Sequence, residues 1–162
     1  DILFDQYVSK KVGAKTIRAD YHFIKDGYKS KAYKINGDID PEGTEDVSYK
    51  LCGGGFKSTS RDFARYLLGI LPGDTGILTA RDRLRMFRDY TSDASTSSYG
   101  LGWSILNNSR ARHAGVQPGA RNEVWIDYKK GNGLIIMANT KELDSSLINS
   151  ARNDIIKLFE LD

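Results

Sequence analysis

The segment between residues 110 and 140 limits the possible folds of this 162-residue chain more than any other segment does. Residues 123–128 and 134–140 are two mainly apolar runs, and the sequence Lys-Lys-Gly-Asn-Gly separates them. A short glycine-containing connection between two apolar runs is typical of a β-hairpin. The sequence therefore predicts two adjacent antiparallel strands, and the polar segment 112–119 comes directly before the first of them.

Two more strands are predicted before this hairpin. Residues 99–106 have the composition of a strand, residues 107–109 are the turn formers Asn-Asn-Ser, and residues 110–115 run back as the antiparallel neighbour. Successive strands that are joined by short turns lie side by side in a sheet. The sequence thus predicts an antiparallel meander.

Apolar residues at helical spacing predict four helices around this sheet. The first covers residues 1–12 and ends at Gly13. The second begins near Arg61 and stops at residues 72–73, Pro-Gly, and its N-cap is one of Ser58, Thr59 and Ser60. The third covers residues 79–90, and the fourth lies at the C-terminal end of the sequence. We therefore expect an α+β fold in which helices pack on the antiparallel meander.

The last two helices also have predicted faces. In residues 79–90, with Thr79 as the cap, the inward side chains are expected to be Leu84, Met86 and Phe87. The water-facing side chains of this helix are expected to be Arg81, Arg83, Arg85 and Arg88. The apolar face of the C-terminal helix is expected to comprise Leu147, Ile148, Ala151, Ile155, Ile156, Leu158 and Phe159.

Turn-forming residues predict the connections. Residues 25–27, Lys-Asp-Gly, predict a peripheral hairpin over residues 21–35, and residues 36–44 predict a surface loop that can rim a pocket. Residues 53–55 are three glycines, but no nucleotide-binding pattern surrounds them, so they indicate a structural turn. Residues 92–98 predict a polar loop.

Composition restricts the partners that such a fold can have. The net charge of +3 is small and the cations are scattered, so the chain is not expected to bind nucleic acid. Cys52 is the single cysteine and is expected in the core, and no ligand spacing indicates a metal. No run is long and apolar enough for a transmembrane segment. We expect neither a cofactor nor a metal ion.

Three blocks of sequence, in this order, resemble the serine β-lactamase and penicillin-binding-protein superfamily, in its class C β-lactamase and esterase branch. They are residues 53–68, residues 99–103, and the H-A-G sequence at residues 113–115 with the two apolar runs that follow it. The resemblance covers residues 50 to 140 well. It implies a C-terminal part of a β-lactamase/transpeptidase-like fold. It also implies that residues 1–162 form a single domain, incomplete on its own, and Asp1 at the start suggests a trimmed polypeptide.

The resemblance also implies an activity. That family transfers acyl groups through a serine in an S-x-x-K element, a second Y-x-N or S-x-N element, and a third K-T-G or H-x-G element. Only the third occurs in these 162 residues, as His113-Ala114-Gly115. The implied function is the C-terminal portion of a serine hydrolase, either an esterase, a peptidase or an amidase, that acts through an acyl-serine and is inactive alone.

Five residues are the candidate site residues that the resemblance implies. His113 would orient the reacting groups, and the N–H of Val116 would donate to the developing oxyanion together with the N–H of the absent serine. Gly115 would let a substrate lie along the strand, Ala114 would flank the cleft, and Asn139 would contact a substrate carboxylate. The competing interpretations are a strand histidine bonded to a neighbour, and an asparagine bonded to backbone at a strand end.

The implied partners follow from the missing elements. An N-terminal half or another chain would cover exposed apolar sheet surface, and the substrate would be a small ester or amide. The resemblance implies a periplasmic or cell-envelope location. Two other functions remain open: a non-catalytic binding or structural module derived from this fold, and an unrelated small α+β binding domain.

Overall fold

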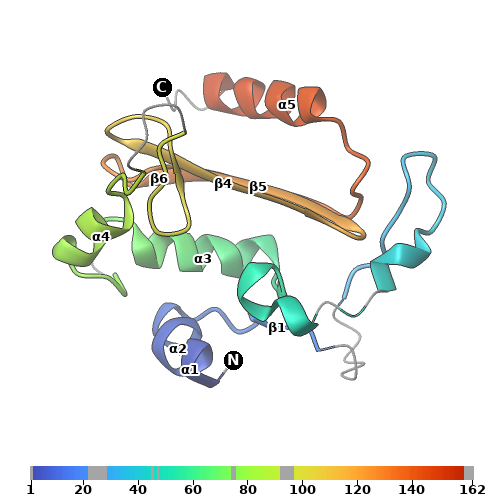
Figure 1. Cartoon of the computed structure of the whole chain (residues 1–162), viewed down its shortest axis with the longest axis horizontal. Helices are drawn as coiled ribbons and strands as arrows, with labels where there is room; N and C mark the ends of the chain where they lie inside the picture. Colours follow the sequence, from blue (N-terminus) through green and yellow to red (C-terminus); the bar gives the residue numbers. More distant parts are fainter. Residues whose placement is uncertain are drawn as a thin grey trace. The chain divides into compact units, whose positions relative to one another are not determined.

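The computed structural model describes residues 2–21, 29–44, 46, 48–73, 76–91 and 97–158 (Figure 1). They group into two compact units, and each unit is described by itself. The first unit comprises Asp1–Ala19, Phe56–His113 and Glu123–Ile135. The second comprises Asp20–Gly55, Ala114–Asn122 and Ile136–Asp162.

A four-stranded sheet with the order β3-β4-β5-β6 confirms the predicted meander. The strands are β3 (Ser104–Ile105), β4 (Arg110–Gln117), β5 (Ala120–Asp127) and β6 (Asn132–Ala138). Gly119 has a φ of 71° between β4 and β5, and Gly131 has a φ of 78° between β5 and β6. Glycine adopts this left-handed conformation at little cost, so both tight turns form at these positions.

The first strand of the sheet is much shorter than the predicted strand over residues 99–106. Strand β3 contains Ser104 and Ile105 only, which pair with Arg112 and Ala111 of β4. Gly102 has a φ of 83°, which breaks an extended strand, and Tyr99 forms an isolated bridge with Ser104 instead. The predicted strand is therefore wrong over most of its length, whereas the turn at residues 107–109 and the return strand are confirmed.

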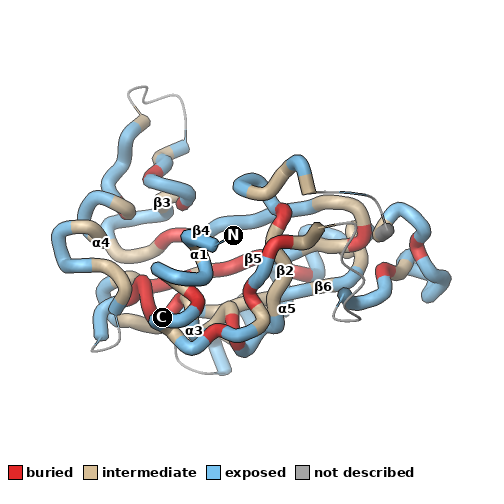
Figure 2. Tube along the Cα trace, turned by 90° about the horizontal axis from the view of Figure 1, so that it is seen from below, coloured by how far each residue is buried: buried red, intermediate tan, exposed pale blue. Residues whose placement is uncertain are grey.

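The core of the first unit lies between the sheet and helix α3 (Ser60–Ile70). The Oγ1 of Thr59 accepts a hydrogen bond from the N–H of Asp62 at 3.3 Å and caps the helix as predicted. The helix ends because Leu71, which precedes Pro72, is extended. Figure 2 marks buried residues along α3 and β5. The buried members of the core are Leu67, Ile70, Leu71, Phe87, Trp103, Ala111, Val124 and Ile126.

Helix α4 (Ala80–Met86) is shorter than the predicted helix over residues 79–90. Its cap is Thr79, as predicted, but Leu84 is 76% exposed, so its assignment to the inner face is wrong. Phe87 leaves helical geometry and turns inward, where its ring stacks on Tyr128 at 4.4 Å. Arg83 is half-buried and donates to the carbonyl of Leu78, so it does not simply face water.

The N-terminal helical segment confirms the prediction for residues 1–12, with one difference. It consists of α1 (Ile2–Phe4), a π-helical stretch η1 (Asp5–Ser9) and α2 (Lys10–Val12). Gly13 ends it with a φ of 68°. The chain then enters β1 (Arg18–Ala19), which pairs antiparallel with β2 (Phe56–Lys57) in a separate two-stranded sheet.

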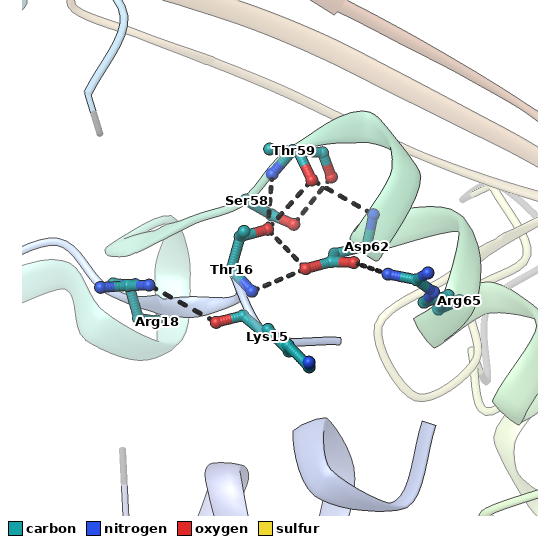
Figure 3. A network of polar contacts seen from close by, with 7 residues as sticks. All are labelled: Lys15, Thr16, Arg18, Ser58, Thr59, Asp62 and Arg65. Atoms are coloured by element: carbon teal, nitrogen blue, oxygen red, sulfur yellow. Dashed lines mark hydrogen bonds and ion pairs between the residues drawn. The ribbon is translucent and has the colours of Figure 1, made fainter. Parts of the chain in front are cut away.

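A buried carboxylate joins this segment to α3 (Figure 3). One oxygen of Asp62 accepts hydrogen bonds from the N–H of Thr16 at 2.6 Å and from its hydroxyl at 2.7 Å. The other oxygen pairs with the Arg65 guanidinium. Asp62 is 3% exposed, so these partners replace the water that a carboxylate normally binds.

The second unit is held together by long-range polar contacts. The carbonyl of Asn139 accepts from the N–H of Tyr33 at 2.8 Å, and Glu142 accepts from the N–H of Ile35 at 2.6 Å. Arg121 donates to the carbonyl of Leu143 at 2.8 Å, just before α5 (Ser145–Leu158). This unit also contains the 3-10 helices η2 (Pro41–Thr44) and η3 (Ser48–Gly53).

Two predictions for the second unit are wrong. Cys52 is exposed in η3 and is not a core residue. On α5, Ile148 is buried, but Leu147 is 55% and Leu158 is 75% exposed, so the predicted apolar face is covered only in part. The loop over residues 36–44 is confirmed as mainly exposed, and Gly54 supports the structural turn with a φ of 132°.

Some predictions fall outside the described residues. The turn of the hairpin at residues 25–27, His22, Phe159 and most of the polar loop over residues 92–98 belong to this group. Tyr33, in the described part of the hairpin, bridges Ile39. None of the helices in the described ranges is long and apolar enough to cross a membrane.

Candidate active site on strand β4

Strand β4 carries four of the five candidate residues, and one part of its edge has no neighbouring strand. In the sheet order β4 lies between β3 and β5, and its pairing with β3 extends only as far as Arg112. Strand β4 continues beyond that point to Gln117. Within the described residues, no strand lies beyond β3 in the sheet order. On the side of β4 that faces β3, the backbone after Arg112 therefore has no neighbouring strand, and we call this part of β4 its open edge.

The pairing with β3 determines which backbone groups point to this edge. The carbonyl of Arg110 accepts a hydrogen bond from the N–H of Leu106, so the hydrogen-bonding groups of Arg110 face β3. In an antiparallel pair, alternate residues direct their N–H and C=O groups to the same side. Residues 112, 114 and 116 therefore face the same side as residue 110. The N–H groups of Ala114 and Val116 point to the open edge.

The side chain of His113 lies next to an aromatic residue of the core. Alternate residues share a face of a strand, so His113 is on the face of Ala111, which is fully buried. The imidazole is exposed and meets the Trp103 ring edge-on, with 6.5 Å between ring centroids. Trp103 is 5% exposed and provides a fixed wall for this contact. The interaction limits the positions that the His113 ring can take.

The residues after His113 are open to solvent. Ala114, Gly115 and Val116 are exposed, with Val116 at 57%. A Cβ added to Gly115 would meet no atom of the described residues within 4 Å, so the face of the strand is open at Gly115. An extended ligand could therefore lie along β4 without displacing side chains.

The end of β4 is anchored by a residue that the sequence did not indicate. The side-chain amide of Gln117 donates a hydrogen bond to the carbonyl of Gly54 at 2.8 Å. A glycine at position 54 is suited to this contact because its φ is positive and any Cβ would approach the Gln117 amide. No sequence pattern links two residues so far apart, so only the fold reveals this anchor.

Asn139 lies after β6, where its side chain is already engaged. Its Nδ2 donates to the carbonyl of Lys31 at 3.1 Å, which is the backbone interaction considered as the alternative to substrate binding. Asn139 is exposed, and its Nδ2 carries a second N–H besides the one that bonds to Lys31. The described residues contain no group of three or more His, Cys, Asp and Glu side chains that could hold a metal ion.

The fold resembles several solved structures. A D-stereospecific amidohydrolase from Streptomyces sp. superposes with a TM-score of 0.66 at 18% identity, covering 88% of this chain and 44% of that chain. A penicillin binding protein from Bacillus halodurans gives a TM-score of 0.66 at 15% identity, with 93% and 48% covered. A beta-lactamase/D-alanine carboxypeptidase from Pseudomonas syringae gives 0.65 at 14% identity, with 88% and 49% covered.

These likenesses show the fold, and the chain spans about half the length of each matched structure. No curated protein matches the sequence. The sequence pattern of the family described as Beta-lactamase matches residues 4–157, which is nearly the whole chain. The α+β fold with its antiparallel meander agrees with this match. The chain belongs to the beta-lactamase family.

Proposed function

We propose that this chain is the C-terminal portion of a serine hydrolase that acts through an acyl-serine. Strand β4 contributes the His113 imidazole and the N–H of Val116, and the nucleophile comes from outside these 162 residues. The observation that carries the proposal is the open edge of β4, toward which the N–H of Val116 points. The H-x-G sequence of the family pattern, residues 113–115, directly precedes Val116 on the same strand.

The proposed chemistry divides the work between two parts of a protein. A serine hydroxyl attacks the acyl carbon of the substrate, and negative charge develops on the carbonyl oxygen. The N–H of Val116 donates a hydrogen bond to this oxygen, together with the N–H of the serine residue. His113, held against Trp103, orients the substrate or the groups around the nucleophile. Without the serine, the chain has no catalytic turnover.

The proposed substrates are small esters or amides. Their acyl part would lie along the open edge of β4, beside Ala114 and Gly115, where exposed backbone offers hydrogen bonds. Two of the similar structures are named as an amidohydrolase and a carboxypeptidase, which supports amide substrates for this fold. Asn139 is the candidate contact for a substrate carboxylate, through the N–H of its Nδ2 that does not bond to Lys31. A periplasmic or cell-envelope location is part of the same proposal.

A covering partner is also part of the proposal. Val116 is 57%, Met137 39% and Leu147 55% exposed, so apolar side chains of the second unit contact water. These side chains are available for a contact with other protein. We propose that the segment or chain that carries the nucleophile covers part of it.

Labelling with a fluorophosphonate probe tests the proposed function. The 162 residues alone should remain unlabelled, because they contain no activated serine. A longer polypeptide that contains them, or their complex with a separate chain, should acquire one probe on a serine outside these residues. Mass spectrometry locates the adduct. Labelling of a serine within the 162 residues, or no labelling of the longer protein or complex, would refute the proposal.

The second candidate is a non-catalytic module that kept the sheet and lost the nucleophile. The absence of S-x-x-K and Y-x-N elements from this sequence favours it. The sequence encoded around the chain distinguishes the two candidates, because the catalytic proposal requires both elements there. A flanking sequence without them would support the module.

A further inference from the structure

The first unit contains a cavity that the proposed acyl-transfer site does not use. Its volume is about 440 Å³, and it lies between the N-terminal helical segment and the two-stranded sheet of β1 and β2. Sites for small molecules have volumes of about 300–1,000 Å³. None of the candidate residues on β4 lines this cavity. Its chemistry must therefore be considered separately.

One part of the cavity wall is apolar. Phe4 and Phe56 meet with 4.8 Å between ring centroids, and Ile17, which also lines the cavity, is 8% exposed. Ile2 is the fourth apolar residue of the wall and is 77% exposed. An aliphatic group bound here would be removed from water by both rings and by the isoleucines.

The other part of the wall carries an excess of positive charge. Lys10, Lys15 and Arg18 line the cavity with a single acidic residue, Asp5. Asp5 pairs with Lys10 at 2.9 Å and neutralises it. The charged side chains that line the cavity are thus three cations and one anion. Arg18 donates to the carbonyl of Lys15 at 3.5 Å, which keeps these two cationic residues close to each other.

The helix beside the cavity has unusual geometry at the same place. Asp5 and Gln6 line the cavity and belong to the π-helical stretch η1. Such π-helical turns are rare in proteins and occur frequently at functional sites. Two of the five residues of this π-helical stretch thus line the cavity.

We propose that this cavity binds an amphipathic anion, a molecule with one anionic head group and a short aliphatic tail. The head group lies between Lys15 and Arg18, and the tail lies against Phe4, Phe56 and Ile17. The apolar wall excludes a small inorganic ion as the preferred ligand, because such an ion gains nothing from it. The cations of the wall favour an anionic head group over a neutral or cationic one.

Isothermal titration calorimetry with butanoate, hexanoate and octanoate tests the proposal at low ionic strength. Each methylene that enters the cavity should tighten binding by about fourfold. Octan-1-ol should bind more weakly than octanoate, and octyltrimethylammonium should not bind. Added salt should weaken the binding of octanoate, because the attraction is electrostatic and exposed.

Charge reversal locates the head group. Lys15→Glu should weaken octanoate binding by about fivefold to tenfold, because an exposed attraction is replaced by repulsion. Lys11→Glu is the matched control, since Lys11 is a lysine of the preceding helix α2 that does not line the cavity, and the affinity of this variant for octanoate should be unchanged. Circular dichroism checks that both variants are folded. Equal affinity of Lys15→Glu and the original protein, equal affinity for octanol, or no saturable binding of any carboxylate would each overturn the proposal.

Discussion

Replacing Val116 with proline should lower kcat about 10²-fold to 10³-fold in the protein that supplies the serine, without unfolding the sheet. Proline has no N–H, so this change deletes one proposed oxyanion donor at the open edge and removes no hydrogen bond between β4 and β5. Proline is tolerated on edge strands where the lost N–H does not point to a neighbouring strand. The N–H of Val116 points to the open edge of β4, so the position satisfies this condition.

Two control variants separate the donor from the side chain and from the proline ring. Val116→Ala keeps the N–H and should retain kcat within about threefold, because the Val116 side chain has no role in the proposed chemistry. Ala114→Pro makes the same backbone change at the other outward-facing position, and its effect on kcat should be at least tenfold smaller than that of Val116→Pro. Equal loss of kcat in the two proline variants would contradict the assignment of Val116 as the donor.

Replacing Asp62 with alanine should reduce the free energy of unfolding by about 3 kcal/mol at neutral pH. The change leaves the N–H and hydroxyl of Thr16 without their acceptor in a site where Asp62 is 3% exposed. Arg65 loses its ion-pair partner at the same time. The hydrogen bonds between Thr16 and Asp62 join the N-terminal segment to α3, so their loss weakens the contact between these two parts of the fold. Urea denaturation followed by circular dichroism measures the loss.

Asp82→Ala provides the matched control for this prediction. Asp82 stands three residues after the cap Thr79 and bonds to it, as Asp62 does with Thr59. Its bonds with Thr79 are exposed, whereas Asp62 also binds Thr16 across the fold. The loss of stability should therefore be much smaller for Asp82→Ala. Similar losses in the two variants would show that the Thr16 contact contributes little.

The same carboxylate predicts a pH dependence. Burial raises the pKa of Asp62, but the hydrogen bonds from Thr16 and the Arg65 guanidinium outweigh this effect and hold the pKa below 3.8. The folded state thus favours the ionised form. This stabilisation is fully present above the unfolded pKa of about 3.9 and is lost as the pH falls through the lower folded value. The stability difference between the original protein and Asp62→Asn should accordingly narrow below about pH 4.

The sheet was predictable from sequence because its turns are local. Glycine at positions 119 and 131 allows tight connections, and the apolar runs beside them specify strands. The shortness of β3 was not predictable, since the positive φ of Gly102 depends on how the surrounding segments of the same chain pack. Leu84 was not predictable either, because α4 ends at Met86 and leaves it 76% exposed, whereas Phe87 is buried as predicted.

The candidate site was predictable in part. The H-x-G sequence indicates His113 and Val116 through a family resemblance, and their roles stay a prediction; periodicity alone does not tell to which side an N–H points. That direction required the hydrogen bond between Leu106 and Arg110. The exposure of Cys52 and the bond from Gln117 to Gly54 depend on tertiary contacts, which local sequence patterns do not encode.

Amide hydrogen exchange along β4, measured residue by residue by NMR on the 162-residue protein, tests the open edge most directly. The N–H groups of Ala114 and Val116 point away from β5 and should exchange rapidly with solvent. The N–H groups of His113 and Gly115 point toward β5 and should be protected. A Val116 amide that exchanges as slowly as that of Gly115 would show that the edge is occupied, and the proposed oxyanion donor would then have to be abandoned.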